Sequence, residues 1–129
     1  MTEEIDALIK KYEGELQSNP DNVEIMTKLG TYYISINNYD KAIELFNKIL
    51  EKEPKNLDVL NNIGIAYTQN GKLTDAITKL EIAVKLYPNN SKLWNNLSEA
   101  YRRAENYHKA NVCRMRAIQL SETEKSLEK

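Results

Sequence analysis

The sequence is poor in cysteine, glycine and proline, and each shortage excludes a class of protein. A single cysteine, Cys113, permits neither a disulfide framework nor a cluster of thiolate metal ligands, and it favours a reducing, cytoplasmic compartment. Four glycines and three prolines are too few for an all-β chain with many tight turns. No stretch approaches the roughly 18 apolar residues of a membrane span, and the acidic start lacks the pattern of a secretory signal. We therefore expect no membrane insertion.

Side chains that could carry out chemistry are equally scarce. The one histidine, His108, cannot form a metal site alone, and Cys113 follows it at five residues, which is not a usual ligand spacing. No serine is placed with a histidine and an acid for nucleophilic catalysis. A net charge of −1 argues against binding to nucleic acid. These shortages predict a protein that is not an enzyme and that has no metal, cofactor or nucleic-acid partner.

What the chain does contain is enough apolar sequence for one folded unit. Of its 129 residues, 41% are hydrophobic and 29% are charged, which is typical of a folded domain and not of a disordered chain. A chain of this length buries roughly two thirds of its unfolded surface. We expect one domain or one short array of repeats.

The sequence repeats itself three times at a constant spacing. Pro20, Pro54 and Pro88 are equally spaced along the chain, and an asparagine follows each proline two positions later. Further positions match at fixed offsets in the three units: Met26, Leu60 and Trp94; Leu29, Ile63 and Leu97; Gly30, Gly64 and Ser98; Tyr33, Tyr67 and Tyr101; Ala42, Ala76 and Ala110; Phe46, Leu80 and Arg114. Within each unit, apolar positions recur at helical spacing. The spacing predicts seven helices, at about 3–18, 22–36, 39–53, 56–69, 73–87, 90–104 and 107–120.

This pattern resembles the tetratricopeptide repeat, in which a large apolar residue, Leu-Gly, Tyr, Ala, Phe, Ala and Pro stand at fixed offsets. The resemblance covers residues 22–122 as three units and is strongest in the second. It implies an all-α fold, a right-handed superhelical array of antiparallel helix pairs with a concave groove. A single domain over 1–129 would then comprise an N-terminal packing helix (1–21), three repeats (22–55, 56–89 and 90–122) and a C-terminal tail (123–129).

Glycine at two positions inside the predicted helices requires a packing explanation. Gly30 and Gly64 each cost a helix about 1 kcal/mol relative to alanine. In the repeat, the small residue of the first helix faces the alanine of the second, which lets the two backbones approach closely. The expected pairs are Gly30 with Ala42, Gly64 with Ala76 and Ser98 with Ala110.

The two ends of the array are expected to differ from its middle. Residues 3–18 fall in register as the second helix of an incomplete unit. At the other end, Arg114 stands where Phe46 and Leu80 stand, which predicts a polar outer face with no further full unit. Ser121 to Glu124 have the pattern of a capping box, which predicts a short extra helix in the tail.

The resemblance places binding residues on the first helices, which form the concave wall in this family. The candidates for this peptide-binding groove are Thr27, Lys28, Thr31, Asn61, Asn62, Ile65, Lys92, Asn95, Asn96, Glu99, Arg102 and Arg103. An asparagine amide both donates and accepts, so it can pair with the backbone of an extended peptide. Asn62 and Asn96 also follow the family's common choice at their position, with or without a peptide. The cations of the third unit predict a partner segment that is acidic there.

The resulting hypothesis is a non-enzymatic protein–protein interaction module that binds an extended or helical segment of another protein. The alternative is a structural scaffold that self-assembles head to tail into a homo-oligomer. Its basis is a charge gradient, because residues 1–50 carry −4, residues 51–90 carry 0 and residues 91–129 carry +3.

Overall fold

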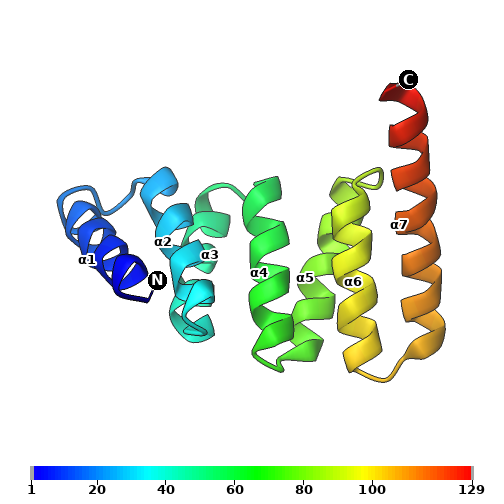
Figure 1. Ribbon diagram of the computed structural model, residues 1–129, viewed down its shortest axis with the longest axis horizontal. Helices are drawn as coiled ribbons and strands as arrows, with labels where there is room; N and C mark the ends of the chain where they lie inside the picture. The colour runs from blue at the N-terminus through cyan, green and yellow to red at the C-terminus, as the bar shows by residue number, and fades with distance from the viewer. Residues whose placement is uncertain (1, 129) are drawn as a thin grey trace.

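The computed structural model describes residues 2–128, and this range contains seven helices and no strand. The helices are α1 (Thr2–Ser18), α2 (Val23–Ser35), α3 (Tyr39–Lys52), α4 (Leu57–Gln69), α5 (Leu73–Leu86), α6 (Ser91–Arg103) and α7 (Tyr107–Glu128). Figure 1 shows them following one another in an elongated stack, with α1 at one end and α7 at the other. The expected all-α helical-repeat fold is confirmed. None of these helices combines the length and the apolar character that a bilayer crossing requires.

Asparagine side chains begin the first helix of every unit. Asn22, Asn56 and Asn90 each accept a hydrogen bond from the backbone N–H three residues further on, at 3.0–3.1 Å. This bond satisfies one of the N–H groups that the first turn of a helix leaves unpaired. The period of these caps therefore sets the period of the fold.

The turn inside each unit requires a left-handed backbone. Asn37, Gly71 and Glu105 have φ angles of 62°, 78° and 64°, and each lies between the two helices of its unit. Glycine and asparagine adopt this conformation at little cost, whereas glutamate does so against its preference. Two of the three turns therefore follow directly from residue type.

Close packing inside each unit involves the two glycines, and the side chains nearest to them are large ones on the facing helix. A Cβ on Gly30 would lie 2.5 Å from Cε1 of Phe46, and one on Gly64 would overlap Cδ2 of Leu80 in the same way. Large side chains one helical turn beyond Ala42 and Ala76 thus lie nearest to the two glycines, and the pairing of the glycines with these alanines stays a prediction. The third expected pair is confirmed: the hydroxyl of Ser98 donates to the carbonyl oxygen of Ala110 at 2.8 Å.

Adjacent units are joined by a hydrogen bond to the repeated tyrosine. Tyr33 donates to Oε2 of Glu13 at 2.7 Å, and Tyr101 donates to Oε1 of Glu81. In the middle junction, the amide of Asn47 donates to the hydroxyl of Tyr67 at 3.3 Å. Thus the second helix of each preceding unit supplies a polar partner at equivalent positions of the repeat. Burial, and then the adjacent carboxylates, raise the pKa of the Tyr33 and Tyr101 phenols, so both stay protonated as donors.

The C-terminal helix differs from the sequence-based expectation in two ways. α7 is continuous to Glu128, so the predicted end at 120 and the separate helix after the capping-box pattern are wrong. The reason is that Glu122 stands where Pro54 and Pro88 follow the ends of α3 and α5, and nothing there stops the helix. Arg114 is exposed, but the outer face around it is not polar throughout, since Met115 is 66% exposed.

Candidate functional site

The first helices of the three units, α2, α4 and α6, form one side of the stack, here called the inner wall. The backbone of α4 approaches both α2 and α6, whereas no Cα atoms of the second helices α1, α3, α5 and α7 come within 8 Å of one another in residues 2–128. Elements on the inside of a curved stack approach one another more closely, so this side is the concave one. All twelve candidate groove residues belong to these three helices.

The junction between α4 and α6 carries the clearest site on the inner wall. The side-chain amide of Asn96 donates to Oδ1 of Asn61, which bridges the two helices. Beside this bridge lies a cavity of about 200 Å³, lined by Ile65, Thr68, Gln69, Asn96, Glu99 and Arg103. Four of these six residues were candidates from the sequence. The cavity has an apolar contribution from Ile65 and hydrogen-bonding groups from the others.

Charges at the end of α6 are arranged around one carboxylate. Arg102 donates two hydrogen bonds to Glu99, at 3.0 and 2.6 Å, and Arg103 donates a third at 2.9 Å. Arg103 also reaches across to the carbonyl oxygen of Thr68 on α4, at 3.3 Å. The bonds from Arg102 and then from Arg103 lower the pKa of Glu99 to about 2. The three side chains together keep one positive charge at neutral pH.

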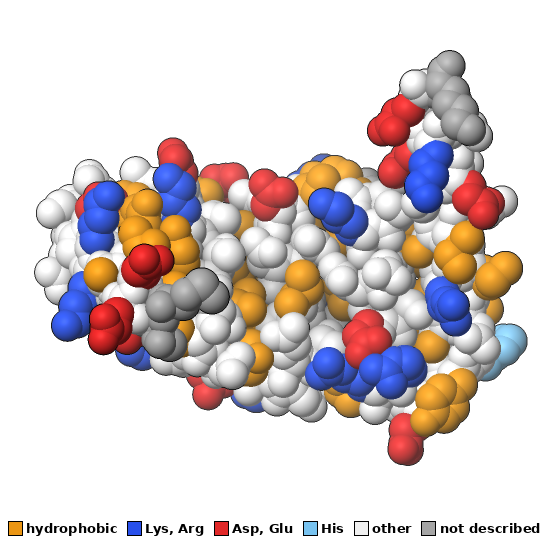
Figure 2. All heavy atoms as spheres, viewed as in Figure 1, with side chains coloured by type: hydrophobic (Ala, Val, Ile, Leu, Met, Phe, Trp, Pro, Cys, Tyr) orange, Lys and Arg blue, Asp and Glu red, His pale blue; other side chains and the backbone are white. Residues whose placement is uncertain are grey.

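Figure 2 looks onto the inner wall and shows this charge distribution. Most of the surface over α4 and α6 is neither charged nor hydrophobic, and basic side chains surround an acidic one near the end of α6. The wall therefore offers hydrogen bonding over most of its surface and net positive charge at one end.

Two further cavities extend the site along α6. One of about 280 Å³ lies on the other side of the asparagine bridge and is lined by Leu57, Asp58, Asn61, Asn90, Ser91, Lys92 and Glu124. Another of about 260 Å³ lies between α6 and α7 and is lined by Ser91, Lys92, Asn95, Ala117, Ile118 and Ser121. Lys92 borders both. Asn95 thus faces the last helix rather than the α4–α6 junction.

The candidates on α2 are occupied by contacts within the chain. The hydroxyls of Thr27 and Thr31 donate to carbonyl oxygens one turn earlier, at 2.8 and 2.9 Å. Lys28 pairs with Glu24 at 3.3 Å, and its ammonium lies 5.7 Å from the ring centre of Tyr12. None of the three lines a cavity at the α4–α6 junction, and neither does Asn62.

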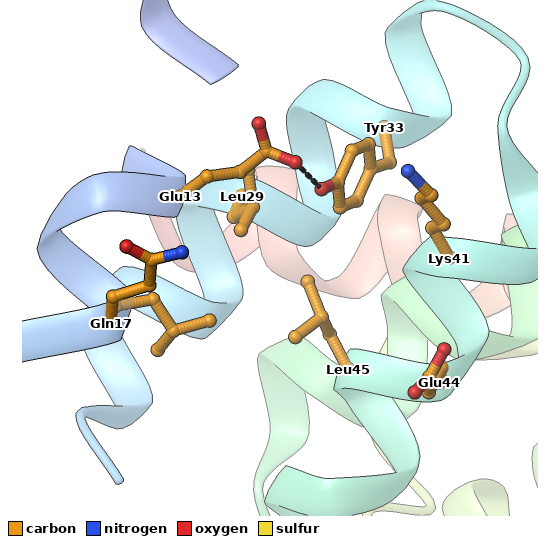
Figure 3. Close-up of a pocket in the computed structure, with 8 residues that line it drawn as sticks. Glu13, Gln17, Leu29, Tyr33, Lys41, Glu44 and Leu45 are labelled. Atoms are coloured by element: carbon orange, nitrogen blue, oxygen red, sulfur yellow. Dashed lines mark hydrogen bonds between the residues drawn. The ribbon is translucent and has the colours of Figure 1, made fainter. Parts of the chain in front are cut away.

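A cavity of about 330 Å³ between α1, α2 and α3 is a feature that the sequence analysis missed. Figure 3 shows the side chains that line it, with the hydrogen bond from Tyr33 to Glu13 at its upper edge. Its lining residues are Glu13, Leu16, Gln17, Leu29, Tyr33, Lys41, Glu44 and Leu45. The sequence does contain one signal of this cavity: Leu45 is apolar, whereas the equivalent position in the next unit is Lys79. Among residues 2–128, no cluster of three His, Cys, Asp or Glu side chains could hold a metal ion.

Comparison with known families identifies the repeat. One tetratricopeptide repeat model matches residues 9–63 and 37–94, and a second model with the same description matches residues 80–110. The chain belongs to the tetratricopeptide repeat family. This membership agrees with the three capped helix pairs, and it confirms the resemblance seen in the sequence.

Solved tetratricopeptide repeat structures are also similar to the chain. MamA MSR-1 superposes with a TM-score of 0.85 at 28% identity, covering 95% of this chain and 71% of its own. MamA AMB-1 gives a TM-score of 0.82 at 30% identity, covering 89% and 68%. MamA from Desulfovibrio magneticus RS-1 gives 0.87 at 17% identity, covering 95% and 69%, which supports the fold alone. No curated protein sequence matches the chain.

The tetratricopeptide repeat architecture narrows the class of function. The family and the MamA structures support a role in protein–protein interaction or as a scaffold, with proteins as partners. Modules of this kind are typically without enzymatic activity.

Proposed function

We propose that this chain binds an extended segment of another protein along the inner wall and carries out no chemistry of its own. The observation that carries the proposal is the bridge between Asn61 and Asn96, which has a cavity on each side. A peptide laid along the wall would cross the bridge with its backbone and place side chains in the two cavities. Such a segment is bound as an extended chain between helices.

The bridge has the hydrogen-bonding pattern of a peptide unit. Each asparagine amide has donor hydrogens on nitrogen and an acceptor oxygen. With Asn96 donating to the oxygen of Asn61, the amide nitrogen of Asn61 is left as a donor and the oxygen of Asn96 as an acceptor. One carbonyl and one N–H of a bound backbone match these two groups, whatever the peptide's side chains are. The bridge therefore supplies affinity, and the cavities supply selectivity.

Charge gives the bound segment a direction. The cluster of Arg102, Arg103 and Glu99 keeps one positive charge at the end of α6, whereas Lys92 at its start shares a cavity with Asp58 and Glu124. Opposite charge on the partner steers association more than it adds affinity. We therefore propose that the segment is acidic, or carries a free carboxyl terminus, where it meets α6.

A displayed library of linear 12-residue peptides, selected on the intact chain, provides the probe. Selected peptides are synthesised with a fluorescent label, and their affinities are measured by anisotropy. The double variant Asn61→Ala with Asn96→Ala is expected to weaken binding at least tenfold. Asn19→Ala, in the exposed turn between α1 and α2, is the matched control and is expected to bind normally.

Two results would count against the proposal. One is that the selected peptides bind the Asn61 and Asn96 double variant as tightly as the parent while both chains give the same circular dichroism spectrum. The other is that Arg102→Glu with Arg103→Glu leaves the affinity of acidic peptides unchanged at physiological salt, where the expected loss is also at least tenfold.

Head-to-tail self-assembly is the second candidate function, and the charge gradient of the sequence favours it. The first 50 residues carry −4 and the last 39 carry +3, so opposite ends of two copies attract. Sedimentation at low and high salt tests this candidate: a concentration-dependent oligomer that salt dissociates supports it, and a monomer at all concentrations contradicts it. For either function we propose a cytoplasmic location, on the basis of the free, buried thiol of Cys113.

A further inference from the structure

The last helix exposes more large apolar side chains than any other described helix. Among the residues that the structure describes, seven large hydrophobic side chains are exposed, and five of them lie on α7. Val112, Met115 and Ile118, at 56%, 66% and 41% exposure, lie three residues apart on α7 and are here called the α7 outer face. Met115 is opposite the buried residues that face α6, whereas Ile118 borders the cavity between α6 and α7. Figure 2 shows hydrophobic side chains along this end of the molecule. Exposed apolar clusters of this kind mark interaction surfaces.

The repeat shows what a surface in this position binds. The positions equivalent to Ile118 are Leu50 on α3 and Val84 on α5, each of which packs within the core beside the next unit's first helix. Val84 is only 4% exposed because α6 covers α5. At Ile118 the α7 outer face thus continues two interfaces already present in the molecule, and a helix is the shape that fits there.

One residue makes this face unsuitable for another standard unit. Met115 stands where Glu13, Asn47 and Glu81 hydrogen-bond the tyrosine of the following helix. A buried tyrosine opposite Met115 would lose its hydrogen-bond partner, whereas an apolar side chain would not. The occupying helix therefore has an apolar contact stripe without the repeated tyrosine.

The charge around the α7 outer face selects an acidic occupant. Arg114 and Arg116 lie on either side of Met115, and no acidic residue occurs between positions 106 and 121. Neither arginine forms an ion pair within residues 2–128. Glutamates flanking a docked helix would meet these cations across the seam.

A second copy of the chain does not offer such a helix. Its acidic helix α1 already packs its apolar residues Ile5, Ile9 and Tyr12 against the core. Two α7 helices paired antiparallel through Met115 would bring Arg114 and Arg116 close to their own symmetry mates, which like charges disfavour.

We propose that the α7 outer face docks an amphipathic helix of a different protein, with an apolar contact stripe flanked by acidic residues. This surface meets the inner wall only at Ile118, so the chain connects two partners, one extended and one helical. The α7 outer face is then a second binding site of the module.

Two synthetic 18-residue helices provide the probes. They share one stripe of leucines at helical spacing, and the flanking positions are glutamate in one peptide and lysine in the other. Anisotropy at physiological salt is expected to show binding of the glutamate peptide and at least tenfold weaker binding of the lysine peptide. The double variant Met115→Glu with Ile118→Glu is expected to bind the glutamate peptide at least tenfold more weakly than the parent chain does. Ile82→Glu, at a 46% exposed position on α5, is the matched control and is expected to change nothing.

Amide chemical shifts of the labelled chain locate the bound peptide. Shifts between residues 107 and 121 support the proposal. Equal affinity for both peptides, or an unchanged affinity of the folded α7 double variant, contradicts it. A dimer of the free chain that this double variant abolishes also contradicts it, because the occupant is then a second copy. Binding of the helical peptide is expected to survive Asn61→Ala with Asn96→Ala, so failure of the inner-wall proposal is seen separately.

Discussion

At the scale of single residues, two glycines set how closely the helices of a unit approach. The space where their Cβ atoms would lie is filled by Phe46 and Leu80, which are fully buried and have no room to withdraw. The absence of one side-chain atom at Gly30 and at Gly64 is thus matched by a large side chain on the facing helix. This pairing explains why glycine is present despite its cost to a helix.

Gly30→Ala and Gly64→Ala should therefore lower the free energy of unfolding by about 1–3 kcal/mol, because overpacking forces the helices apart. Gly14→Ala is the matched control, since nothing lies within 4 Å of its Cβ position inside α1. It should raise the free energy of unfolding by about 0.5–1 kcal/mol through helix propensity. Urea denaturation measures all three variants. Equal stability changes at Gly14 and Gly30 would contradict this packing.

The carboxylate of Glu99 provides a second test at this scale. The Glu99 carboxyl group should titrate with a pKa near 2 rather than the ordinary 4.5, because Arg102 and Arg103 donate hydrogen bonds to its charged form. A lowered pKa means that the stabilisation is complete above about pH 4.5 and is lost as the pH falls towards 2. Side-chain NMR titration measures this directly. In Arg102→Ala the midpoint should move up towards 4.5, and an unshifted Glu99 in the parent chain would show that the cluster does not form.

The sequence predicted which helices carry these side chains, but not which side chains contact one another. Spacing put Asn61 and Asn96 on one wall, but only side-chain geometry reveals that they bond to each other. Arg102 and Arg103 lie three and four residues after Glu99, so both spacings allow a pair without requiring one. The contact of Gly30 with Phe46 was not foreseen, because the sequence period does not say which side chain fills the space beside a glycine.

At the scale of elements, caps and stops decide where the helices begin and end. The asparagine caps fix the starts of α2, α4 and α6, and proline follows the ends of α1, α3 and α5, so those boundaries were close to the expected ones. The end of α7 was missed because the pattern from Ser121 to Glu124 is compatible with either a cap or a helix interior. The absence of proline at position 122 was the more informative signal.

Glu122→Pro tests this explanation. Proline should end α7 near residue 121, as it ends the equivalent helices, because it removes one helical hydrogen bond and clashes with the preceding turn. Residues 122–128 are exposed, so global stability should change little. Amides from about residue 122 onwards should lose protection from hydrogen exchange, while amides of α6 stay protected. Unchanged protection of α7 would mean that something other than the missing proline extends it.

At the scale of the whole molecule, the repeat produces two kinds of surface. The inner wall is assembled from three helices, and the binding site that we propose there depends on contacts between units, such as Asn61 with Asn96. The α7 outer face is a single helix whose usual cover is absent from the described residues. The inner wall was expected from the family resemblance. The α7 outer face was not expected, because Arg114 alone predicted a polar end.

In the proposed complex, a peptide backbone crosses the asparagine bridge on the inner wall. The most direct measurement is NMR of the chain with labelled asparagine side chains, titrated with an acidic peptide selected from the linear library. The largest side-chain amide shifts should occur at Asn61 and Asn96, and smaller ones at Asn95. Shifts confined to the second helices or to the α7 outer face, with both bridge amides unmoved at saturation, would contradict peptide binding at the asparagine bridge.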